Sequence, residues 1–546
     1  MEHITVLQAI LCGIVYWLAI GNLPFVGLWT LQRPLVCGMV TGLILGHPVE
    51  GAVIGATINL IYLGFISAGG SMPADMSLAG ILGTVFAVEG GLSTQMALAL
   101  AAPIGILGTV VWTVRMTADS IFVHMADRYI QKEQYHKIWK ANVLYPQLFC
   151  AVITIPPCAM AAYLGGRYSA DLFQLADGRA LTVMQILGGI MPALGIATTL
   201  RYIFEKEAKV FLFVGFLLAV YTQLPVHMIG VIALLVAVLY LQVTDREDSV
   251  EADDEEDEGD TEDEGEASEI RHILPKAALV KAWLIWETFP QTCYNYERMM
   301  GQQMAHVFTP VISYLYPDRP QERRKLMERE SVFFNTHVEV GACVPGMTIA
   351  LEEQKALGEP IPDALIKSLK VTFMSSLAGV GDTIWQGVFL PLMLTFCIDI
   401  TRKGDGNLWG VLIYTLVVLV TAYVLSYQNF MFGYKMGGES ILDMLEHRKM
   451  RKFIRGASIM GCMMMGTLIA EYVSVSCGMT VSAAESSMSL QKELFDAICP
   501  GILPLLLTLL IYHLQKHRGW KPIYLIAFMI LISILGGLTG FLVPVQ

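Results

Sequence analysis

The sequence has few charged residues and lacks the compact motifs by which soluble enzymes are usually recognised. Only 15% of its 546 residues are Asp, Glu, Lys or Arg, whereas a soluble chain of this size carries about a quarter. It has no nucleotide-binding loop, zinc motif or serine-type triad, and its ten cysteines form no CxxC pair. These absences argue against a large soluble enzyme and a disulfide scaffold. We also expect no cofactor, no metal ion and no catalytic residue on this chain.

Acidic charge is concentrated in one segment. The net charge is −12, but residues 245–269 hold 16 of the 48 acidic residues and one of the 36 basic residues. The other residues, 32 acidic and 35 basic, carry a balance of +3 and form no large basic patch, so nucleic-acid binding has no support. The segment is almost free of apolar residues and its like charges repel, which predicts a disordered, extended linker. Binding of a cation or partner by this segment is the alternative.

Long apolar stretches make up most of the chain, in which 55% of the residues are hydrophobic. They predict an all-α polytopic membrane protein with two helical halves and broken or re-entrant helices. Pro225 should divide the stretch 208–243, because proline removes a helix hydrogen bond. Glycines spaced by four residues at 38–46 and 51–55 predict closely packed helices, or a surface on which helices slide. The candidate membrane segments lie near residues 4–28, 34–66, 78–114, 147–165, 183–200, 208–243, 371–398, 408–432, 456–475, 500–514 and 523–543.

Basic loops predict the orientation in the membrane. The loop 515–521 (QKHRGWK) joins the last two apolar segments, and the positive-inside rule places it in the cytoplasm. The final segment would then cross outward. The same rule places the basic clusters 319–329 and 447–455 on the cytoplasmic side.

Polar clusters beside glycine and proline interrupt the apolar stretches at 55–75, 333–346, 350–354 and 376–387. Polar residues at membrane depth are costly and are therefore functional candidates. Broken helices at matching positions of two halves indicate a transporter site, although helix caps and polar braces are the structural alternative. The candidate substrate-binding residues are Asn59, Asp75, Asn335, His337, Glu352 and Asp382.

Short motifs follow one another through the second half. They are NYERM (Asn295–Met299), Tyr316–Pro317, FFNT (Phe333–Thr336), LEEQ (Leu351–Gln354), LAGVGD (Leu377–Asp382), Gly433–Tyr434, Gly456–Ser458 and PGILPLLLT (Pro500–Thr508). In this order they resemble the IID subunit of the mannose-type (mannose/fructose/sorbose) sugar phosphotransferase system.

The first half carries a looser set of motifs. They are RPL (Arg33–Leu35), GLILG (Gly42–Gly46), GATINLIYLG (Gly55–Gly64) and VLYLQV (Val238–Val243). This half is similar to the partner IIC subunit of the same family.

The resemblance implies a fused chain, with a IIC-like domain at 1–244, a linker at 245–269 and a IID-like domain at 270–546. It implies a permease that imports a hexose or amino sugar, which the cytoplasmic IIB partner, charged by IIA, phosphorylates on release. The phosphoryl-accepting histidines would belong to those partners. It also implies a core that moves against a scaffold as in an elevator, and a homotrimer in the lipid of the bacterial inner membrane.

The first half departs from the family pattern. Asn59 stands where the family commonly has a glutamate, and Gly27–Gln32 lacks the acidic or histidine residues common there. His47 replaces an acidic residue, and the proline before Asp75 is shifted by one position. A carboxylate only accepts hydrogen bonds, whereas an amide also donates them, so the sugar preference of the first half is open.

Two other functions remain compatible with the sequence. An ion-coupled secondary sugar transporter could bind a proton or sodium ion at Asp75, Asp382 or Glu352. A non-transporting membrane receptor or scaffold would need no sugar-sized cavity between the halves.

Overall fold

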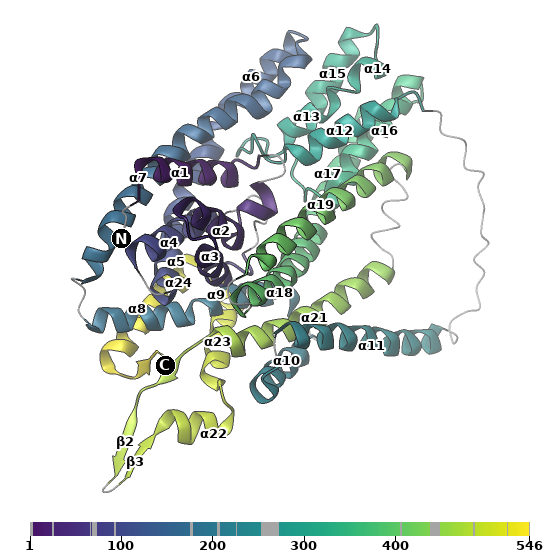
Figure 1. The fold of residues 1–546 in the computed structure, drawn as a ribbon. Helices are drawn as coiled ribbons and strands as arrows, with labels where there is room; N and C mark the ends of the chain where they lie inside the picture. Colours follow the sequence, from purple (N-terminus) through teal and green to yellow (C-terminus); the bar gives the residue numbers. More distant parts are fainter. Residues whose placement is uncertain are drawn as a thin grey trace.

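The computed structural model of the chain is built almost entirely from helices, with two small antiparallel sheets (Figure 1). Pro225 and residues 253–269 of the acidic segment lie outside the described residues. The structure describes residues 4–23, 27–65, 67, 72, 74–91, 94–174, 178–204, 208–224, 226–252, 272–403, 407–436, 448–483, 486–520 and 522–544.

Local sequence signals set the helix ends in the first half. α1 begins with a capping box, in which the Gln8 N–H donates to Thr5 Oγ1 (3.3 Å) and the Thr5 N–H donates to Gln8 Oε1 (2.9 Å). α2 and α3 each begin with proline, which suits the first helical position. The helices are α1 (Val6–Ile20), α2 (Pro34–Leu45), α3 (Pro48–Ile61), α4 (Met76–Gly90), α5 (Thr94–Ala118), α6 (Ser120–Gln131), α7 (Tyr145–Gln174), α8 (Gly178–Ile190), α9 (Pro192–Ile203), α10 (Lys209–Thr222) and α11 (Val226–Ala252), with single turns at Gly27–Leu31, Tyr135–Lys137 and Lys140–Leu144.

The glycines spaced by four residues hold α2 and α3 in a tight hairpin. A Cβ atom added to Gly38 would lie 2.7 Å from the Gly55 Cα, and one added to Gly42 would lie 2.8 Å from the Gly51 Cα. Side chains cannot fit at such distances, so the predicted close packing of these helices is confirmed.

The second half is also helical. Its helices are α12 (Lys276–Thr288), α13 (Gly301–Phe308), α14 (Ile312–Leu315), α15 (Pro320–Glu330), α16 (Cys343–Leu357), α17 (Asp363–Gly381), α18 (Leu390–Lys403), α19 (Trp409–Met436), α21 (Arg448–Tyr472), α22 (Asp496–Ile498), α23 (Ile502–His517) and α24 (Pro522–Thr539), with helical turns at Val340–Ala342, Asp382–Phe389 and Gln491–Phe495. Its strands are β1 (Ser476–Cys477), β2 (Thr480–Ala483), β3 (Ser486–Ser489) and β4 (Leu542–Val543).

The two halves interleave rather than form separate bodies. α21 packs on α10 and α11, α23 on α9, α24 on α8, and α18 on α3 (Figure 1). Arg298 of the NYERM motif donates to both oxygens of Asp127 on α6 (2.8 Å each). Buried Arg115 on α5 donates to the backbone carbonyls of Gln291 (2.9 Å) and Thr292 (3.1 Å). The contact between the halves is therefore polar as well as apolar.

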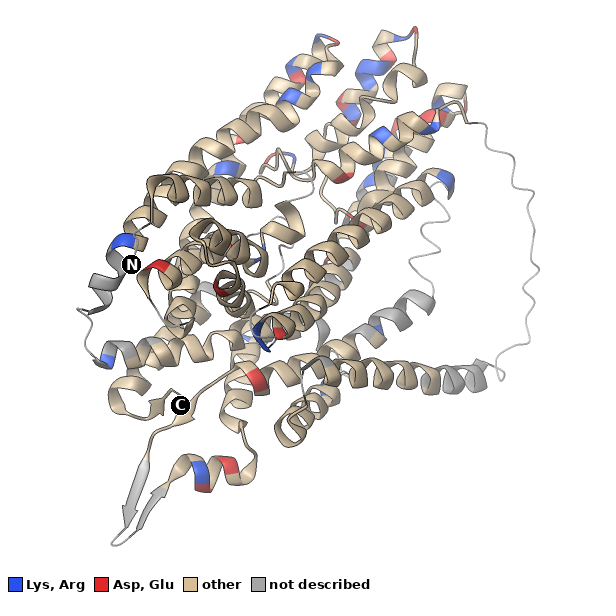
Figure 2. Ribbon diagram, in the orientation of Figure 1, with Lys and Arg blue, Asp and Glu red and all other residues tan. Residues whose placement is uncertain are grey.

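Several helices have the length and composition of membrane spans. In the described part of the chain, four pass this test: Thr94–Gln131, Tyr135–Arg167, Ile384–Lys403 and Trp409–Lys435. A fifth candidate is the pair Gln491–Ile498 and Ile502–His517, which is bent by 66°. Most of the helices carry few charges, whereas charged residues gather along α15 and towards one end of α6 and of α16 (Figure 2). The helical character of the predicted fold is thus confirmed.

Three local features refine the predicted organisation. The break between α10 and α11 falls at the predicted division of 208–243. α11 then continues past residue 245 to Ala252, because extending an existing helix costs far less than starting one. The four short strands were not predicted, but they leave the fold predominantly helical. β2 (TVSA) and β3 (SSMS) are only four residues long, which is a weak signal of strand pairing that the long apolar stretches obscured.

Candidate functional site

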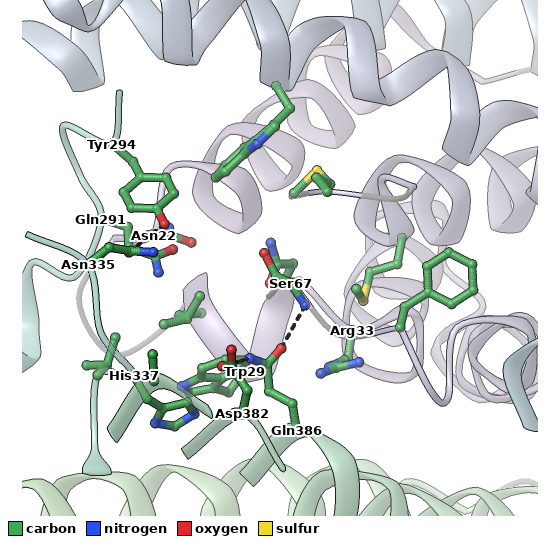
Figure 3. A pocket seen from close by; sticks show the side chains of 18 of the residues that line it. Asn22, Trp29, Arg33, Ser67, Gln291, Tyr294, Asn335, His337, Asp382 and Gln386 are labelled. Atoms are coloured by element: carbon green, nitrogen blue, oxygen red, sulfur yellow. Dashed lines mark hydrogen bonds between the residues drawn. The ribbon is translucent and has the colours of Figure 1, made fainter. Parts of the chain in front are cut away.

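A cavity of about 770 Å³ lies where the two halves meet (Figure 3). One wall comes from the segment between α1 and α2 and from the segment that connects α3 to α4. The other comes from the loops before α13 and α16 and from the end of α17. The lining residues are Asn22, Leu28, Trp29, Gln32, Arg33, Phe65, Ser67, Met72, Ala74, Met76, Trp112, Gln291, Tyr294, Asn335, Thr336, His337, Val338, Ala378, Asp382 and Gln386.

A break in the backbone shapes the first-half wall. Leu28 is extended (φ −56°, ψ 144°), and Trp29 adopts a positive φ of 60°. A positive φ is strained for a bulky residue and persists only where the surroundings hold it. The Trp29 carbonyl accepts a hydrogen bond from the Tyr414 hydroxyl (2.8 Å), and its ring stacks on His337 (centroids 5.9 Å apart). Groups of the second half therefore hold a strained first-half residue in the wall.

A single hydrogen bond and one short chain of hydrogen bonds order the second-half wall. The Tyr294 hydroxyl donates to Asn335 Oδ1 (2.7 Å). The Gln386 amide donates to Asp382 Oδ1 (2.7 Å), and Gln386 Oε1 accepts from the Ser67 N–H of the first half (3.1 Å). The helical turn Asp382–Phe389 follows α17 directly, so the end of that helix aims these side chains at the cavity.

Several buried polar atoms in this cavity wall have no partner among the described residues. They are the Nε and Nη1 atoms of Arg33, which is 2% exposed, and both amide atoms of Asn22. Thr336 Oγ1 and His337 Nε2 are also unpaired. Leaving a buried donor or acceptor unsatisfied costs about 1–3 kcal/mol each. These groups can donate to and accept from a ligand rich in hydroxyls, which would recover that cost.

Three of the six candidate residues predicted from the sequence, Asn335, His337 and Asp382, line this cavity. Asn335 belongs to the FFNT motif and His337 directly follows it, whereas Asp382 ends the LAGVGD motif. The other three lie away from the cavity lining, where the protein supplies partners for the carboxylates of Asp75 and Glu352 and for Asn59 Oδ1, whereas Asn59 Nδ2 is buried without a partner among the described residues.

Asp75 and Asn59 hold first-half elements in place. Asp75 caps α4, because its Oδ1 accepts from the N–H groups of Ser77 (3.1 Å) and Leu78 (3.0 Å). Its Oδ2 accepts from the Tyr16 hydroxyl (2.6 Å). Asn59 Oδ1 accepts from the Leu35 N–H (3.3 Å) and thereby ties α3 to the start of α2.

Glu352 belongs to a buried ion cluster of the second half. It pairs with Arg329 and accepts from the Tyr316 hydroxyl (3.4 Å). Arg329 also faces Glu330 (3.4 Å), which pairs with Lys370 (3.0 Å). Since opposite charges face one another here, the cluster connects α15, α16 and α17 as a brace.

At the exposed edge of this brace, Asp363 begins α17. The hydrogen bond from Lys355, together with the nearby Arg329, holds the pKa of this carboxyl below its usual range. Asp363 is therefore negative at neutral pH, as a residue at a helix N-terminus should be.

The sequence reasoning missed the first-half side of the site. Arg33 belongs to the RPL motif but is not among the six candidate residues, and neither are Asn22 and Trp29. A signal for Arg33 existed, because it is the single Lys or Arg between residues 1 and 114. Asn22 and Trp29 lie outside the polar clusters, and only the folded backbone turns them toward the cavity.

Within the described residues, no group of three or more His, Cys, Asp or Glu side chains is placed to hold a metal ion. Nine of the ten cysteines are buried, and none of the ten forms a disulfide bond. The chemistry available at the cavity is thus hydrogen bonding, ion pairing and aromatic contact.

Two family models match the chain, one on each half. The first, described as the PTS system sorbose-specific IIC component, matches residues 6–239. The second, described as the PTS system mannose/fructose/sorbose family IID component, matches residues 273–542. A chain of the cryo-EM structure of the mannose transporter ManYZ with microcin E492 is 31% identical, covers 49% of this chain and 98% of that chain, and has a TM-score of 0.29.

Curated relatives repeat this division. The mannose-specific EIID component of Escherichia coli (strain K12) is 32% identical over 259 residues, which are 46% of this chain and 89% of the relative. The mannose-specific EIIC component of the same strain is 27% identical over 248 residues, which are 45% of this chain and 93% of the relative. The chain therefore belongs to the mannose/fructose/sorbose family of sugar phosphotransferase systems and joins their IIC and IID membrane components in one polypeptide.

Proposed function

We propose that this chain binds a hexose or amino sugar in the cavity between its halves and delivers it to a cytoplasmic IIB partner, which IIA has charged, for phosphorylation. The observation that carries the proposal is the set of unpaired, buried polar atoms around one cavity between the halves. Phosphorylation of the released sugar makes uptake one-way, since the charged product no longer fits a site that took a neutral or singly charged sugar.

The polar residues around the cavity would share the sugar between the halves. Arg33 and Asn22 of the first half would donate to hydroxyl oxygens, and Asp382 would accept from hydroxyl groups. Asn335 and His337 would complete the contact from the second half. The Trp29 ring offers an apolar face for the carbon side of the sugar ring.

The departures of the first half from the family pattern bear on this site. Trp29 lies in Gly27–Gln32, the stretch that lacks the acidic or histidine residues common in the family. Asn59, which stands in place of a glutamate, braces α2 and α3 instead of lining the cavity. We therefore infer that these departures retune the sugar preference rather than remove the site.

The wider features of the family would follow from the same arrangement. A IIC-like domain (1–244), a linker (245–269) and a IID-like domain (270–546) would assemble as a homotrimer in the lipid of the bacterial inner membrane. One helix group would move against the other as in an elevator and carry the sugar at their junction. The hydrogen bond from Ser67 to Gln386 crosses the cavity and would have to break when this junction opens.

A binding screen followed by transport tests this function. The purified full chain should bind at least one hexose or amino sugar, and Asp382→Ala should weaken that binding. Asn59→Ala is the control, because Asn59 lies outside the cavity lining. In vesicles, uptake should require phosphorylated IIB.

Two outcomes would contradict the proposal. Uptake that ignores phosphorylated IIB but collapses with an ionophore would indicate an ion-coupled secondary transporter. Failure of every sugar to bind the folded chain would indicate a receptor or scaffold.

A further inference from the structure

Glu339 lies behind two of the side chains that line the cavity between the halves. Its Oε1 accepts a hydrogen bond from the Trp29 indole N–H, and its Oε2 lies 3.2 Å from His337 Nδ1. The rings of Trp29 and His337 stack, with their centroids 5.9 Å apart and an angle of 13° between their planes. One carboxyl group therefore contacts both members of a stacked pair, of which Trp29 belongs to the first half and His337 to the second.

The backbone around Glu339 is held from two sides. The Trp286 indole N–H of α12 donates to the Val338 carbonyl (2.8 Å), and the Asn429 amide of α19 donates to the Glu339 carbonyl (3.0 Å). Two long helices thus fix the segment from which the side chains of Glu339 and His337 project.

The contacts of His337 place a proton on the Glu339 carboxyl group. His337 Nδ1 faces the Val340 N–H (3.5 Å), which is a donor, so this ring nitrogen is an acceptor. Glu339 Oε2, which lies beside the same nitrogen, can then form a hydrogen bond with it only as a protonated oxygen that donates. A neutral ring that accepts at Nδ1 carries its own proton on Nε2.

The surroundings favour this neutral form of Glu339. The side chain is 1% exposed and lines a second cavity, of about 420 Å³, together with Glu287 of α12. No Lys or Arg is among the described residues that line this second cavity, and Asp382 lies nearby on the side of the first. A buried carboxylate that has other carboxylates near it and no cation beside it is strongly unfavourable, and a bound proton removes this cost.

We propose that Glu339 is a positioning residue of the sugar site, whose protonated carboxyl group holds the Trp29 ring with one oxygen and the Nε2–H tautomer of His337 with the other. The inference rests on the proposed sugar site and assigns donor and acceptor roles within it. Glu339 lies outside the lining of the first cavity, so it acts through its two neighbours.

The proposal gives His337 a defined part in sugar recognition. Its Nε2 has no partner among the described residues, and the ring lines the first cavity. In this tautomer Nε2 only donates, so it binds a sugar oxygen that acts as an acceptor, whereas Asp382 accepts from a sugar hydroxyl group. Glu339 thereby determines which of the two hydrogen-bonding roles His337 offers to the sugar.

Glutamine and methionine are the matched replacements that test the proposal. The amide oxygen of glutamine can accept from Trp29 while its NH₂ group donates to His337, as a protonated glutamate does. A charged carboxylate would accept from both rings, which an amide cannot do. Methionine is similar in size but replaces neither hydrogen bond.

Binding of glucose, mannose, galactose, fructose and glucosamine to the purified full chain would be measured by calorimetry. Glu339→Met should weaken binding of the preferred sugar about tenfold, as expected when its hydrogen-bonding groups lose their orientation. Glu339→Gln should restore most of this loss. Thermal melting of each variant checks that it is folded.

Two further variants separate positioning from a general effect on the fold. Glu287→Met removes the other carboxyl group of the second cavity, whose described hydrogen bond is to Ser426, and should leave sugar affinity nearly unchanged. In a chain that already carries His337→Phe, Glu339→Met should cause much less further loss of affinity than in the parent chain, because the group through which Glu339 acts is gone. Equal losses in both backgrounds would overturn the inference and leave Glu339 a structural residue.

Infrared spectroscopy provides a test that needs neither a sugar nor an unstable variant. At neutral pH the parent chain should show the band of a protonated carboxyl group, and Glu339→Gln should remove it. An unchanged band, or a failure of Glu339→Gln to restore binding, would overturn the inference, since Glu339 would then act as a charged carboxylate. Full sugar affinity in Glu339→Met would overturn it but leave the sugar site standing, whereas a parent chain that binds no sugar would refute the proposed function itself.

Discussion

Two buried polar regions of this chain differ in how their charges are satisfied. In the brace of the second half, Arg329 faces Glu352 and Glu330, and Glu330 pairs with Lys370. At the cavity between the halves, Arg33 is equally buried, but two of its guanidinium nitrogens have no partner. Burial alone therefore does not mark a functional residue.

The difference separates stability from binding. Where buried charges face one another, removing one leaves its partner uncompensated, which lowers the stability of the fold. Where an incompletely paired buried charge lines a cavity, removing it changes the stability of the fold little and weakens ligand binding instead. The expected effects of matched substitutions in the two regions are therefore opposite.

The largest effect is expected in the brace. Arg329→Met leaves Glu352 and Glu330 buried without their cation, and should lower stability by about 3–5 kcal/mol. Thermal unfolding of the purified chain in detergent measures this loss. Arg324→Met, which breaks only the exposed pair with Glu328, should cost about 1 kcal/mol or less. Similar losses in both variants would contradict the buried brace.

The cavity should show the opposite behaviour. Arg33→Met removes an incompletely paired cation, so sugar affinity should fall by about 1.5–3 kcal/mol, or roughly ten- to a hundredfold. Its thermal midpoint should change little, since the described contact with Tyr414 is a single hydrogen bond. A strongly destabilised chain that binds sugar normally would show that Arg33 is a structural residue.

Asp75 and Asp382 are carboxylates with similar sequence surroundings, but one caps a helix and the other lines the cavity. Asp75→Ala removes a helix cap and should cost about 1 kcal/mol of stability without changing the sugar dissociation constant. Asp382→Asn should raise the dissociation constant and leave the thermal midpoint nearly unchanged. Calorimetry measures the sugar dissociation constant of both variants, and thermal melting measures their stability. The opposite pattern would mean that Asp75 binds the sugar and Asp382 supports the fold.

The smallest effect is expected outside both regions. A neutral segment of equal length in place of residues 253–269 should leave uptake in vesicles unchanged, because we predict that this segment only connects the two domains. A large loss of uptake at unchanged expression would show that its charge serves another purpose.

Patterns along the chain predicted much of the fold. Apolar stretches, glycine spacing and the division near 225 indicated the helices and the tight α2–α3 hairpin. The strands near the C-terminal end escaped because such short segments are a weak signal beside long apolar segments. In the site, local motifs pointed to Asn335, His337 and Asp382, since each belongs to a polar break in an apolar stretch.

The same reasoning could not separate ligand-facing residues from braces. Asp75 and Glu352 also interrupt apolar stretches, but their partners, Tyr16 and Arg329, come from other segments of the chain. A carboxylate that is satisfied by a distant side chain and one that faces a cavity have the same local sequence signature. Only the packed structure distinguishes them.

The sequence by itself determined the helical membrane character, the separation of charge into one strip, and the order of motifs that places the chain in its family. Each of these depends on composition or on contacts between near neighbours. The tertiary structure decided that Trp29 and Arg33 meet His337 and Asp382 around one cavity, and that Glu287 and Glu339 meet beside it. Such residues are brought together by packing between helices of different halves, and no local pattern records which distant side chains a fold will pair or leave unpaired.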